Sequence, residues 1–393
     1  MRSVHREETG FSLLETVVAS ALLLLVMGSV FQALNPAQGA LSTAPERADV
    51  QQRLRVALTV LARTIGHAGS GPVYGAAAGP LVERVAAVFP YRVGRRNADA
   101  PGTARPDAIT VLWVERGAHQ ASLAQPLAAS SGPAVISLAS HCPQGDPSCG
   151  FTAGSMVLVM GDAGRFDLFS VTAVQATTLT LQHNTRDSLF VYPAGSAIVE
   201  VHSRTFFLKA DAANDQFQLV RYDGDDGAEA PVVDHVAALS FRYRAEPLPP
   251  RMIKSVTDPN GPWTTYGPRP PAPIEQPTSF PPGENCVFQL DGASNPSPRL
   301  PDLSASTLVD LPLSQLNDGP WCADEADPNR FDADLLRVRA VTVAVRIEAS
   351  AASLRGPAGL LFARGGTARG ADRVVVDAEQ TLDMTPPNLF PGR

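Results

Sequence analysis

The sequence predicts an α+β protein in which one long N-terminal α-helix packs on a mainly antiparallel β-rich domain. Three features predict this class: an apolar run near the N-terminus, an amphipathic helical pattern behind it, and many short β-like runs between turn residues. We expect a short polar leader at residues 1–10, a membrane-spanning helix at 11–34, a linker and amphipathic helix at 35–71, and the β-rich domain at 72–393.

The apolar run begins at Gly10-Phe11-Ser12-Leu13-Leu14-Glu15 and continues from Thr16 to Leu34. Glu15 is the one ionisable group among roughly two dozen residues, and about 20 apolar residues suffice for a helix to cross a bilayer. A carboxylate inside the bilayer costs on the order of 3 kcal/mol. The sequence therefore predicts a membrane helix whose carboxylate requires a partner.

These residues resemble the class III leader and cleavage site of type IV pilins and type II secretion pseudopilins. The resemblance implies that a prepilin peptidase cuts after Gly10 and that the new amine of Phe11 is N-methylated. It also implies that Glu15 sets subunit registry in a filament by pairing with that amine on a neighbouring subunit. A single-pass anchor and a secretory signal peptide are the alternatives. The second is disfavoured because the run is longer than a signal core and Val30-Phe31-Gln32-Ala33 lacks a small-x-small cleavage pattern.

An amphipathic helix is expected after a break or kink at Asn35-Pro36, because proline removes a helix hydrogen bond. From Glu46 onward one apolar stripe recurs at steps of three or four residues. Its members are Val50, Leu54, Leu58, Leu61 and Ile65. Gly66 and the segment 68–71 are expected to end the helix. The run from Arg53 to Gly69 resembles a segment that follows the anchor in PilW-like minor pilins and J-type pseudopilins.

The remaining chain is expected to form antiparallel strands, with turns at Gly, Asp and Asn clusters. The expected strands are 108–115, 155–160, 166–174, 177–182, 197–209, 216–222, 236–244 and 373–380. Within Val236 to Arg244, apolar and polar side chains alternate, which is typical of a half-buried strand. Five segments occur in an order that is similar to the body of PilW-like minor pilins: Gly161-Asp162, Arg204-Thr205-Phe206-Phe207-Leu208, Leu219-Val220-Arg221-Tyr222, the run 233–243 and the run 336–346.

A proline-rich insertion at about 246–332 interrupts this resemblance. Its prolines exclude a central strand or a long helix through its middle. A loop of this length inside a domain is usually functional or disordered. Two interpretations remain open: a surface loop packed on the sheet, or a surface that faces a partner or the filament tip.

The chain contains four cysteines, and an even number of cysteines in a domain that is translocated across a membrane favours disulfides. Three pairings are possible, and we favour Cys142–Cys149 and Cys286–Cys322 because each pair is local in sequence. A zinc site is disfavoured, since no C-x-x-C spacing occurs and only His141 adjoins a cysteine.

No motif indicates an enzyme, a cofactor or a catalytic residue: the metalloprotease, nucleophile-elbow, phosphate-loop and dinucleotide patterns do not occur. The histidines are isolated, and we expect capping or surface roles for His67, His183, His202 and His235. Two acidic groups offer oxygen ligands for Ca²⁺, although solvated turns are the favoured interpretation because neither has EF-hand spacing. These groups are Asp223, Asp225 and Asp226, and Asp324, Glu325 and Asp327.

The resemblance implies a minor pilin that sits at the tip or initiation complex of a type IV pilus and supports assembly, motility or adhesion. A J-type type II secretion pseudopilin is the close alternative, and a membrane-anchored periplasmic binding module or enzyme is the remoter one. The implied partners are prepilin peptidase, other minor and major pilins, the inner-membrane assembly platform and a tip adhesin. The net charge of −7 argues against nucleic acid as the main partner. The implied location is the inner membrane, with the C-terminal domain in the periplasm, and later the filament.

Overall fold

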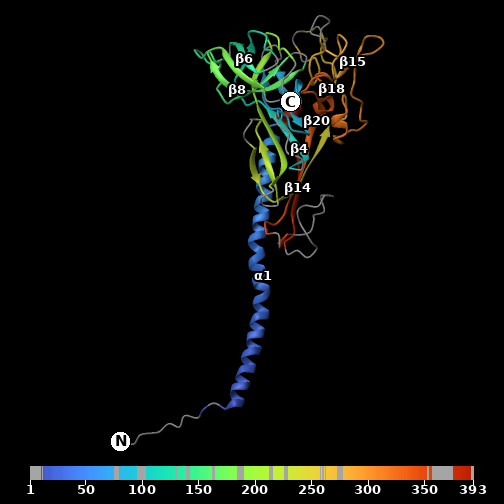
Figure 1. Cartoon of the computed structure of the whole chain (residues 1–393). Coiled ribbons are helices and arrows are strands. Elements are labelled where there is room, and N and C mark those ends of the chain that lie inside the picture. Colours follow the sequence, from blue (N-terminus) through green and yellow to red (C-terminus); the bar gives the residue numbers. More distant parts are fainter. Residues whose placement is uncertain are drawn as a thin grey trace.

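The longest element is α1, a helix of 54 residues at Leu13–Gly66. Its N-terminal half projects away from the rest of the chain, and its C-terminal half lies against the β-rich domain (Figure 1). The computed structural model describes residues 10, 12–74, 79–94, 103–128, 131–138, 142–161, 164–183, 190–211, 216–224, 229–256, 258, 261, 263–271, 278–351, 354–355 and 375–390, with the backbone alone for 33–42 and 106. The α+β class predicted from the sequence is confirmed.

The predicted break at Asn35-Pro36 is wrong, because α1 continues as helix through both residues. A proline inside a helix removes one hydrogen bond and crowds the preceding turn. The hydrogen bonds of the turns on either side remain available, so the helical path need not stop there. The predicted end is confirmed: α1 ends at Gly66 and His67 is its C-cap.

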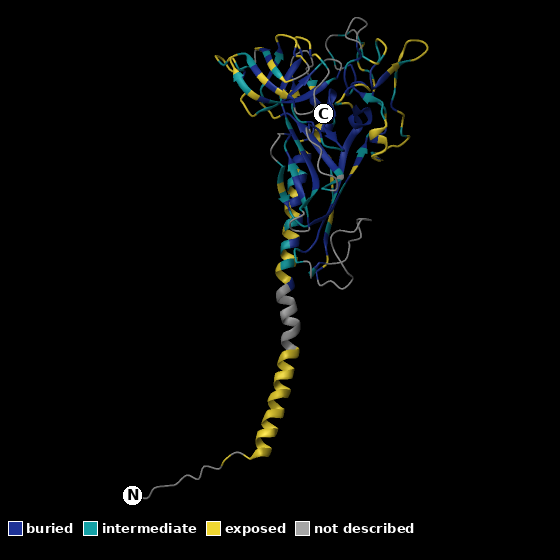
Figure 2. Cartoon of the chain, in the orientation of Figure 1, coloured by how far each residue is buried: buried dark blue, intermediate teal, exposed yellow. Residues whose placement is uncertain are grey.

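The amphipathic stripe of α1 forms part of the main core. Val50, Leu54, Leu58, Leu61 and Ile65 are all buried. This half of α1 contacts strands β20 (Val338–Ile347) and β21 (Ala378–Met384). Burying each such side chain contributes about 1.5–3 kcal/mol. Figure 2 shows the resulting contrast along one helix: the described residues of its N-terminal half are exposed, whereas buried, intermediate and exposed residues alternate in its C-terminal half.

Polar contacts add to this docking. The carboxylate of Glu46 accepts a hydrogen bond from Ser350 Oγ at 2.7 Å. The guanidinium of Arg53 pairs with Asp49 at 2.7 Å on its own helix and with Asp234 at 3.2 Å, next to β13. The contacts of Glu46 with Ser350 and of Arg53 with Asp234 link α1 to the body and favour the rotation in which its apolar stripe faces the sheet.

Two antiparallel sheets form the body beside α1. The first has the order β13-β12-β11-β4-β3, and the second has the order β17-β14-β20-β21. Their bounds are β3 Val88–Phe89, β4 Ala104–Trp113, β11 His202–Asp211, β12 Gln216–Tyr222, β13 Glu229–Val233, β14 Val236–Ala245, β17 Val309–Leu311, β20 Val338–Ile347 and β21 Ala378–Met384. In β14 the side chains of Leu239, Phe241 and Tyr243 are buried, as the alternation predicts.

A closed six-stranded barrel is inserted between β4 and β11, and the sequence analysis did not predict it. Its strand order is β10-β5-β6-β9-β8-β7. The bounds are β5 Gln120–Leu123, β6 Gly132–Ser137, β7 Met156–Met160, β8 Phe166–Gln175, β9 Thr178–His183 and β10 Ala197–Glu200. The barrel closes where β5 pairs with β10, for example Ala121 with Ile198.

Strand β7 explains how the barrel joins the body. Val157 and Val159 point into the barrel core, whereas Leu158 and Met160 belong to the main core. Alternate side chains of a strand face opposite sides, so β7 is buried on both faces. This two-sided burial accounts for its continuous apolar sequence.

Two predicted strands need correction. The run 197–209 is not one strand, because β10 ends at Glu200 and β11 starts at His202. Strand β10 belongs to the barrel and strand β11 belongs to the first sheet, so the chain leaves the barrel and enters the sheet at Val201. The last strand is β21, Ala378–Met384, rather than 373–380, and residues 371–374 lie outside the described part.

The insertion contains only short regular elements among its described residues, which agrees with its proline content. They are β15 Phe288–Leu290, β16 Pro296–Pro298, β17, η2 Gln315–Asn317, β18 Trp321–Cys322 and β19 Phe331–Asp332. The other short elements of the chain are β1 Pro72–Val73, β2 Gly79–Pro80, η1 Leu81–Glu83, η3 Ala333–Arg337 and η5 Pro387–Leu389. The insertion and the barrel lie side by side at the end of the molecule opposite the N-terminus (Figure 1).

Candidate functional site: the exposed N-terminal helix

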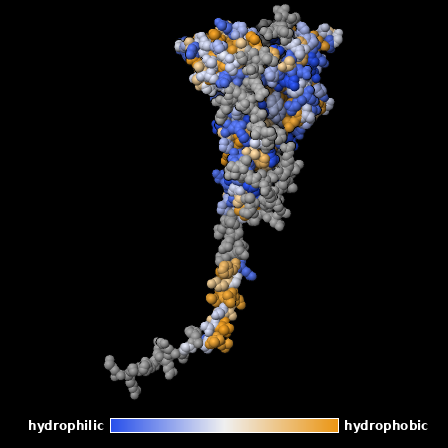
Figure 3. Space-filling view, in the orientation of Figure 1, coloured by the Kyte–Doolittle hydropathy of each residue, from blue (hydrophilic) through white to orange (hydrophobic). Residues whose placement is uncertain are grey.

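The first half of α1 is an exposed apolar helix. Its span Leu13–Gln32 is long and apolar enough to cross a membrane, and none of it is buried inside the molecule. Leu14, Leu24 and Phe31 each expose about 70% of their surface: 74%, 72% and 69%. Figure 3 shows this segment as a hydrophobic shaft outside the domain. Because exposing each large apolar side chain costs about 1.5–3 kcal/mol in water, the segment is suited to a membrane anchor or a signal, and a bilayer or other helices can cover it.

Glu15 takes part in the N-terminal cap of this helix. Ser12 is the N-cap, and its hydroxyl accepts a hydrogen bond from the backbone N–H of Glu15 at 3.2 Å. The Glu15 carboxylate in turn accepts from the backbone N–H of Ser12 at 3.5 Å. This capping box satisfies two of the free amides at the helix start. It also holds a carboxylate at the N-terminal end of the exposed helix.

The predicted processing site is adjacent to this cap. Gly10 is exposed, and a Cβ built on it meets nothing within 4 Å. Phe11 and residues 1–9 lie outside the described residues, so the predicted N-methylation remains a prediction.

Both predicted disulfides are present, Cys142–Cys149 and Cys286–Cys322. The first joins residues of the barrel region next to β5, where Cys149 is buried. The second connects the interior of the insertion to β18, and both of its cysteines are fully buried. Disulfides persist in oxidising compartments, which indicates an extracytoplasmic domain.

Neither of the two acidic groups is arranged as a cation site among the described residues. The favoured interpretation, solvated turns, is wrong for Asp324 and Asp327, because both are buried. Asp223 pairs with Arg204 at 3.2 Å and with Arg221 at 2.9 Å, while Asp225 and Asp226 lie outside the described part. Asp324 and Asp327 both face the guanidinium of Arg165, at 3.7 and 3.8 Å. Glu325 is exposed. A bound cation would lie close to the guanidinium groups of these arginines, which would repel it.

A third acidic group, which the sequence analysis missed, consists of Asp318, Asp332 and Asp334. Their carboxylate oxygens lie within 4.8 Å of one another. Asp332 already accepts three backbone hydrogen bonds, from Asp318, Gly319 and Asp334, and Asp334 pairs with Arg337 at 3.2 Å. The group stabilises the turn before η3.

His183 is not a capping or surface residue, as the sequence analysis expected. It is buried at the end of β9, and its Nε2 lies 2.8 Å from the carboxylate of Asp167. The phenolic hydroxyl of Tyr192 donates to the same carboxylate at 2.8 Å, and the side-chain amide of Asn329 donates to it as well. Asn329 belongs to the insertion, so this buried network joins the insertion to the barrel.

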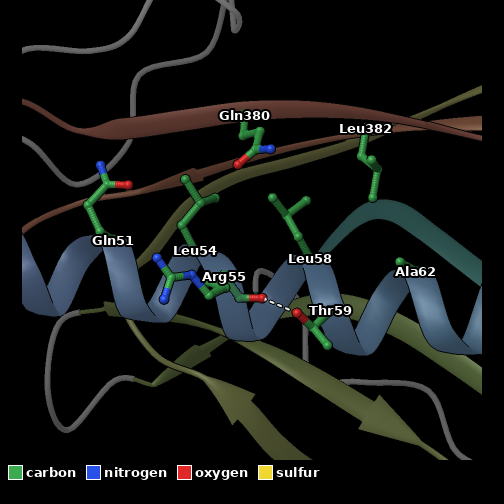
Figure 4. A pocket seen from close by; sticks show the side chains of 8 residues that line it. All are labelled: Gln51, Leu54, Arg55, Leu58, Thr59, Ala62, Gln380 and Leu382. Carbon is green, nitrogen blue, oxygen red and sulfur yellow. Dashed lines mark hydrogen bonds between the residues drawn. The ribbon is translucent and has the colours of Figure 1, made fainter.

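An open groove runs between α1 and the edge strand β21 (Figure 4). Its volume is about 370 Å³, and Leu54, Leu58 and Leu382 contribute its apolar part. The helix side carries Gln51, Arg55, Thr59 and Ala62, and the strand adds Gln380. The described residues that line the groove include no histidine, cysteine or carboxylate.

Comparison with known proteins gives no assignment: no family model, no curated protein and no solved structure matches this chain. The geometry itself defines a class, namely a β-rich extracytoplasmic domain carried on one long helix whose exposed N-terminal half is apolar.

Proposed function

We propose that the chain is a minor pilin of a type IV pilus system, processed by prepilin peptidase after Gly10 and incorporated at the pilus tip or initiation complex. One observation carries this proposal. A single 54-residue helix combines an exposed apolar half, which contains one carboxylate near its start, with a second half that packs on the β-rich body. An ordinary anchor needs neither the carboxylate nor helical continuity into the core.

Assembly follows from the exposed half of α1. In the bilayer, lipid covers its apolar side chains; in a filament, the equivalent helices of neighbouring subunits cover them. Exchanging lipid for protein leaves hydrophobic burial nearly unchanged, so close packing and polar pairing decide the register. Cleavage after Gly10 creates a cationic amine on Phe11, and Glu15 of a neighbour is the group available to neutralise it.

The proposed partners follow from the two ends of the molecule. The apolar helix meets prepilin peptidase, the assembly platform and other pilin subunits. The barrel and the insertion, at the opposite end, face the tip and any adhesin there. A J-type pseudopilin of a type II secretion system would use the same helix and is the second candidate. Two co-assembly experiments, one with purified minor pilins of a type IV pilus system and one with purified pseudopilins of a type II secretion system, distinguish the two candidates.

The variant Glu15→Ala tests the proposal. We expect the variant chain to enter the membrane and to be processed, yet to be lost from sheared filaments, because the carboxylate partner is missing. Ser20→Ala is the matched control: Ser20 is exposed five residues further along, and its hydroxyl donates to Thr16 O of the same helix at 2.7 Å. Normal incorporation and function of Glu15→Ala would remove the main support for the proposal. Catalytic turnover by the β-rich domain would favour the enzyme alternative.

A further inference from the structure

The barrel and the insertion meet at a buried junction that contains more acidic than basic groups. Arg165, in the turn before β8, places its guanidinium between two carboxylates of the insertion. Its Nη2 lies 3.7 Å from Asp324 Oδ2, and its Nε lies 3.8 Å from Asp327 Oδ2. The guanidinium also stacks on Phe190, 3.7 Å from the ring centroid. Arg165 is thus held in place by barrel and insertion together.

A third carboxylate, Asp167 of β8, faces the same junction from the barrel. It is fully buried and is contacted by His183 of β9, Tyr192 and Asn329. Three carboxylates therefore face one permanent cation, Arg165, and one histidine. If all three carboxylates were ionised, one negative charge would remain uncompensated with the histidine protonated and two with the histidine neutral.

The two carboxylates of the insertion differ in their hydrogen bonds. Asp324 accepts from the backbone N–H groups of Ser279 at 2.6 Å and of Ala326 at 3.1 Å. Burial raises its pKa, but these bonds outweigh burial and the pKa lies below the usual value. Asp324 is therefore the ionised partner of Arg165.

Asp327 lacks this compensation. Its Oδ1 accepts from the backbone N–H of Asn329 at 2.9 Å, whereas its Oδ2 is buried and accepts no hydrogen bond from any described residue. Burial, with the nearby charges of Asp167 and Asp324, raises the pKa of Asp327 to about 6, against the lowering effects of the Asn329 N–H and Arg165.

We propose that this junction is a pH-dependent latch, in which protonated Asp327 holds the insertion against the barrel and ionised Asp327 loosens it. The inference rests on the junction geometry and is independent of the proposed function. The neutral acid is favoured in the closed junction, where a further negative charge would face Asp167 and Asp324. The charged form is favoured once Asp327 reaches water.

The direction of the pH effect follows from the raised pKa. The stabilisation is fully present below the ordinary pKa of 3.8 and is lost as pH rises through about 6. The equilibrium between closed and open junction should therefore shift about tenfold toward open between pH 5 and pH 7. Since barrel and insertion form the distal end of the molecule (Figure 1), the latch would change the surface presented there.

Hydrogen exchange of the full chain in lipid nanodiscs tests the latch. The peptide 323–330 contains the amides of Asp327 and Arg330, which donate to Asp324 O at 3.1 Å and to Asp327 O at 3.2 Å. After correction for the intrinsic pH dependence of exchange, we expect protection factors about tenfold lower at pH 7 than at pH 5. Equal protection at the two pH values would overturn the proposal.

Three variants assign the titration. Asp327→Asn should show protection that differs less than twofold between the two pH values, whereas Asp310→Asn, an exposed acid of the insertion, should keep the tenfold change. A tenfold change that persists in Asp327→Asn would assign it to His183 or Asp167 and overturn the role of Asp327. If Asp327→Asn does not fold, Arg165→Gln serves instead: losing the cation should move the midpoint above pH 6, and an unchanged or lower midpoint contradicts the proposal.

Discussion

The Cys286–Cys322 disulfide should stabilise the protein more than the Cys142–Cys149 disulfide, because it closes a longer loop. The two bonds join residues that are 36 and 7 positions apart. The chain-entropy model gives about 4 kcal/mol for the longer loop and about 2.5 kcal/mol for the shorter one. Replacing both cysteines of a pair by alanine should lower the free energy of unfolding by about these amounts, so the two variants should differ by ~1.5 kcal/mol.

Urea unfolding of the full chain in detergent micelles measures both losses. Circular dichroism follows the β-rich domain, and in a Trp113→Phe background the fluorescence of Trp263 and Trp321 follows the insertion that the longer loop constrains. Coincident transitions of the two signals justify a single free energy of unfolding. Equal losses for the two variants, or a greater loss for the shorter loop, would refute the loop-entropy reasoning.

Two further predictions concern the docking of α1. Leu61→Ala should lower the free energy of unfolding by about 2–5 kcal/mol, because Leu61 is fully buried. Val56 is exposed on the same helix, so Val56→Ala should change this free energy by less than ~0.5 kcal/mol. Equal shifts of the thermal unfolding midpoint in the two variants would contradict the docking of α1. Glu46→Gln should cost ~0.5–1 kcal/mol at pH 7. Burial raises the pKa of Glu46, but hydrogen bonds from Ser350 outweigh burial and hold it below 4.5. Its contribution is therefore present above pH 4.5 and lost as pH falls, so a variant effect that grows on acidification would be inconsistent with this contact.

The local features of the fold could be predicted from the sequence. The stripe from Val50 to Ile65 depends on spacing along one helix, and all five of its members are buried. The alternation in β14 depends on spacing along one strand. The disulfide pairs were predicted because their cysteines are close in sequence.

The features that depend on distant pairing could not be predicted. The barrel closes through Ala121 and Ile198, which are separated by most of the module, and no local pattern encodes that pairing. The continuous apolar sequence of β7 indicates that both faces of the strand are buried. It does not indicate that one face packs in the barrel core and the other in the main core. Residues 197–209 were predicted as one strand because the sequence has a β-like pattern on both sides of Val201.

The polar contacts of the buried junction could not be predicted either, because they also join residues that are distant in sequence. His183 and Asp167 lie on neighbouring strands, yet Asn329 comes from the insertion, far along the chain. A lone histidine at a strand end gives no sign of such a partner. One signal was present: the single ionisable residue of β8, Asp167, lies between the apolar residues Phe166 and Leu168, and a buried carboxylate requires a polar partner. The helix through Pro36 is a different failure, since proline weakens a helix without always ending it.

The most direct test of the account is mass spectrometry of the N-terminus of the chain purified from cells that contain its assembly system. The account predicts a mature chain that begins at Phe11 with a methylated amine and retains the apolar sequence from Leu13 onward. A chain that still begins at Met1, or one that begins near Ala33 after removal of the apolar segment, would contradict it.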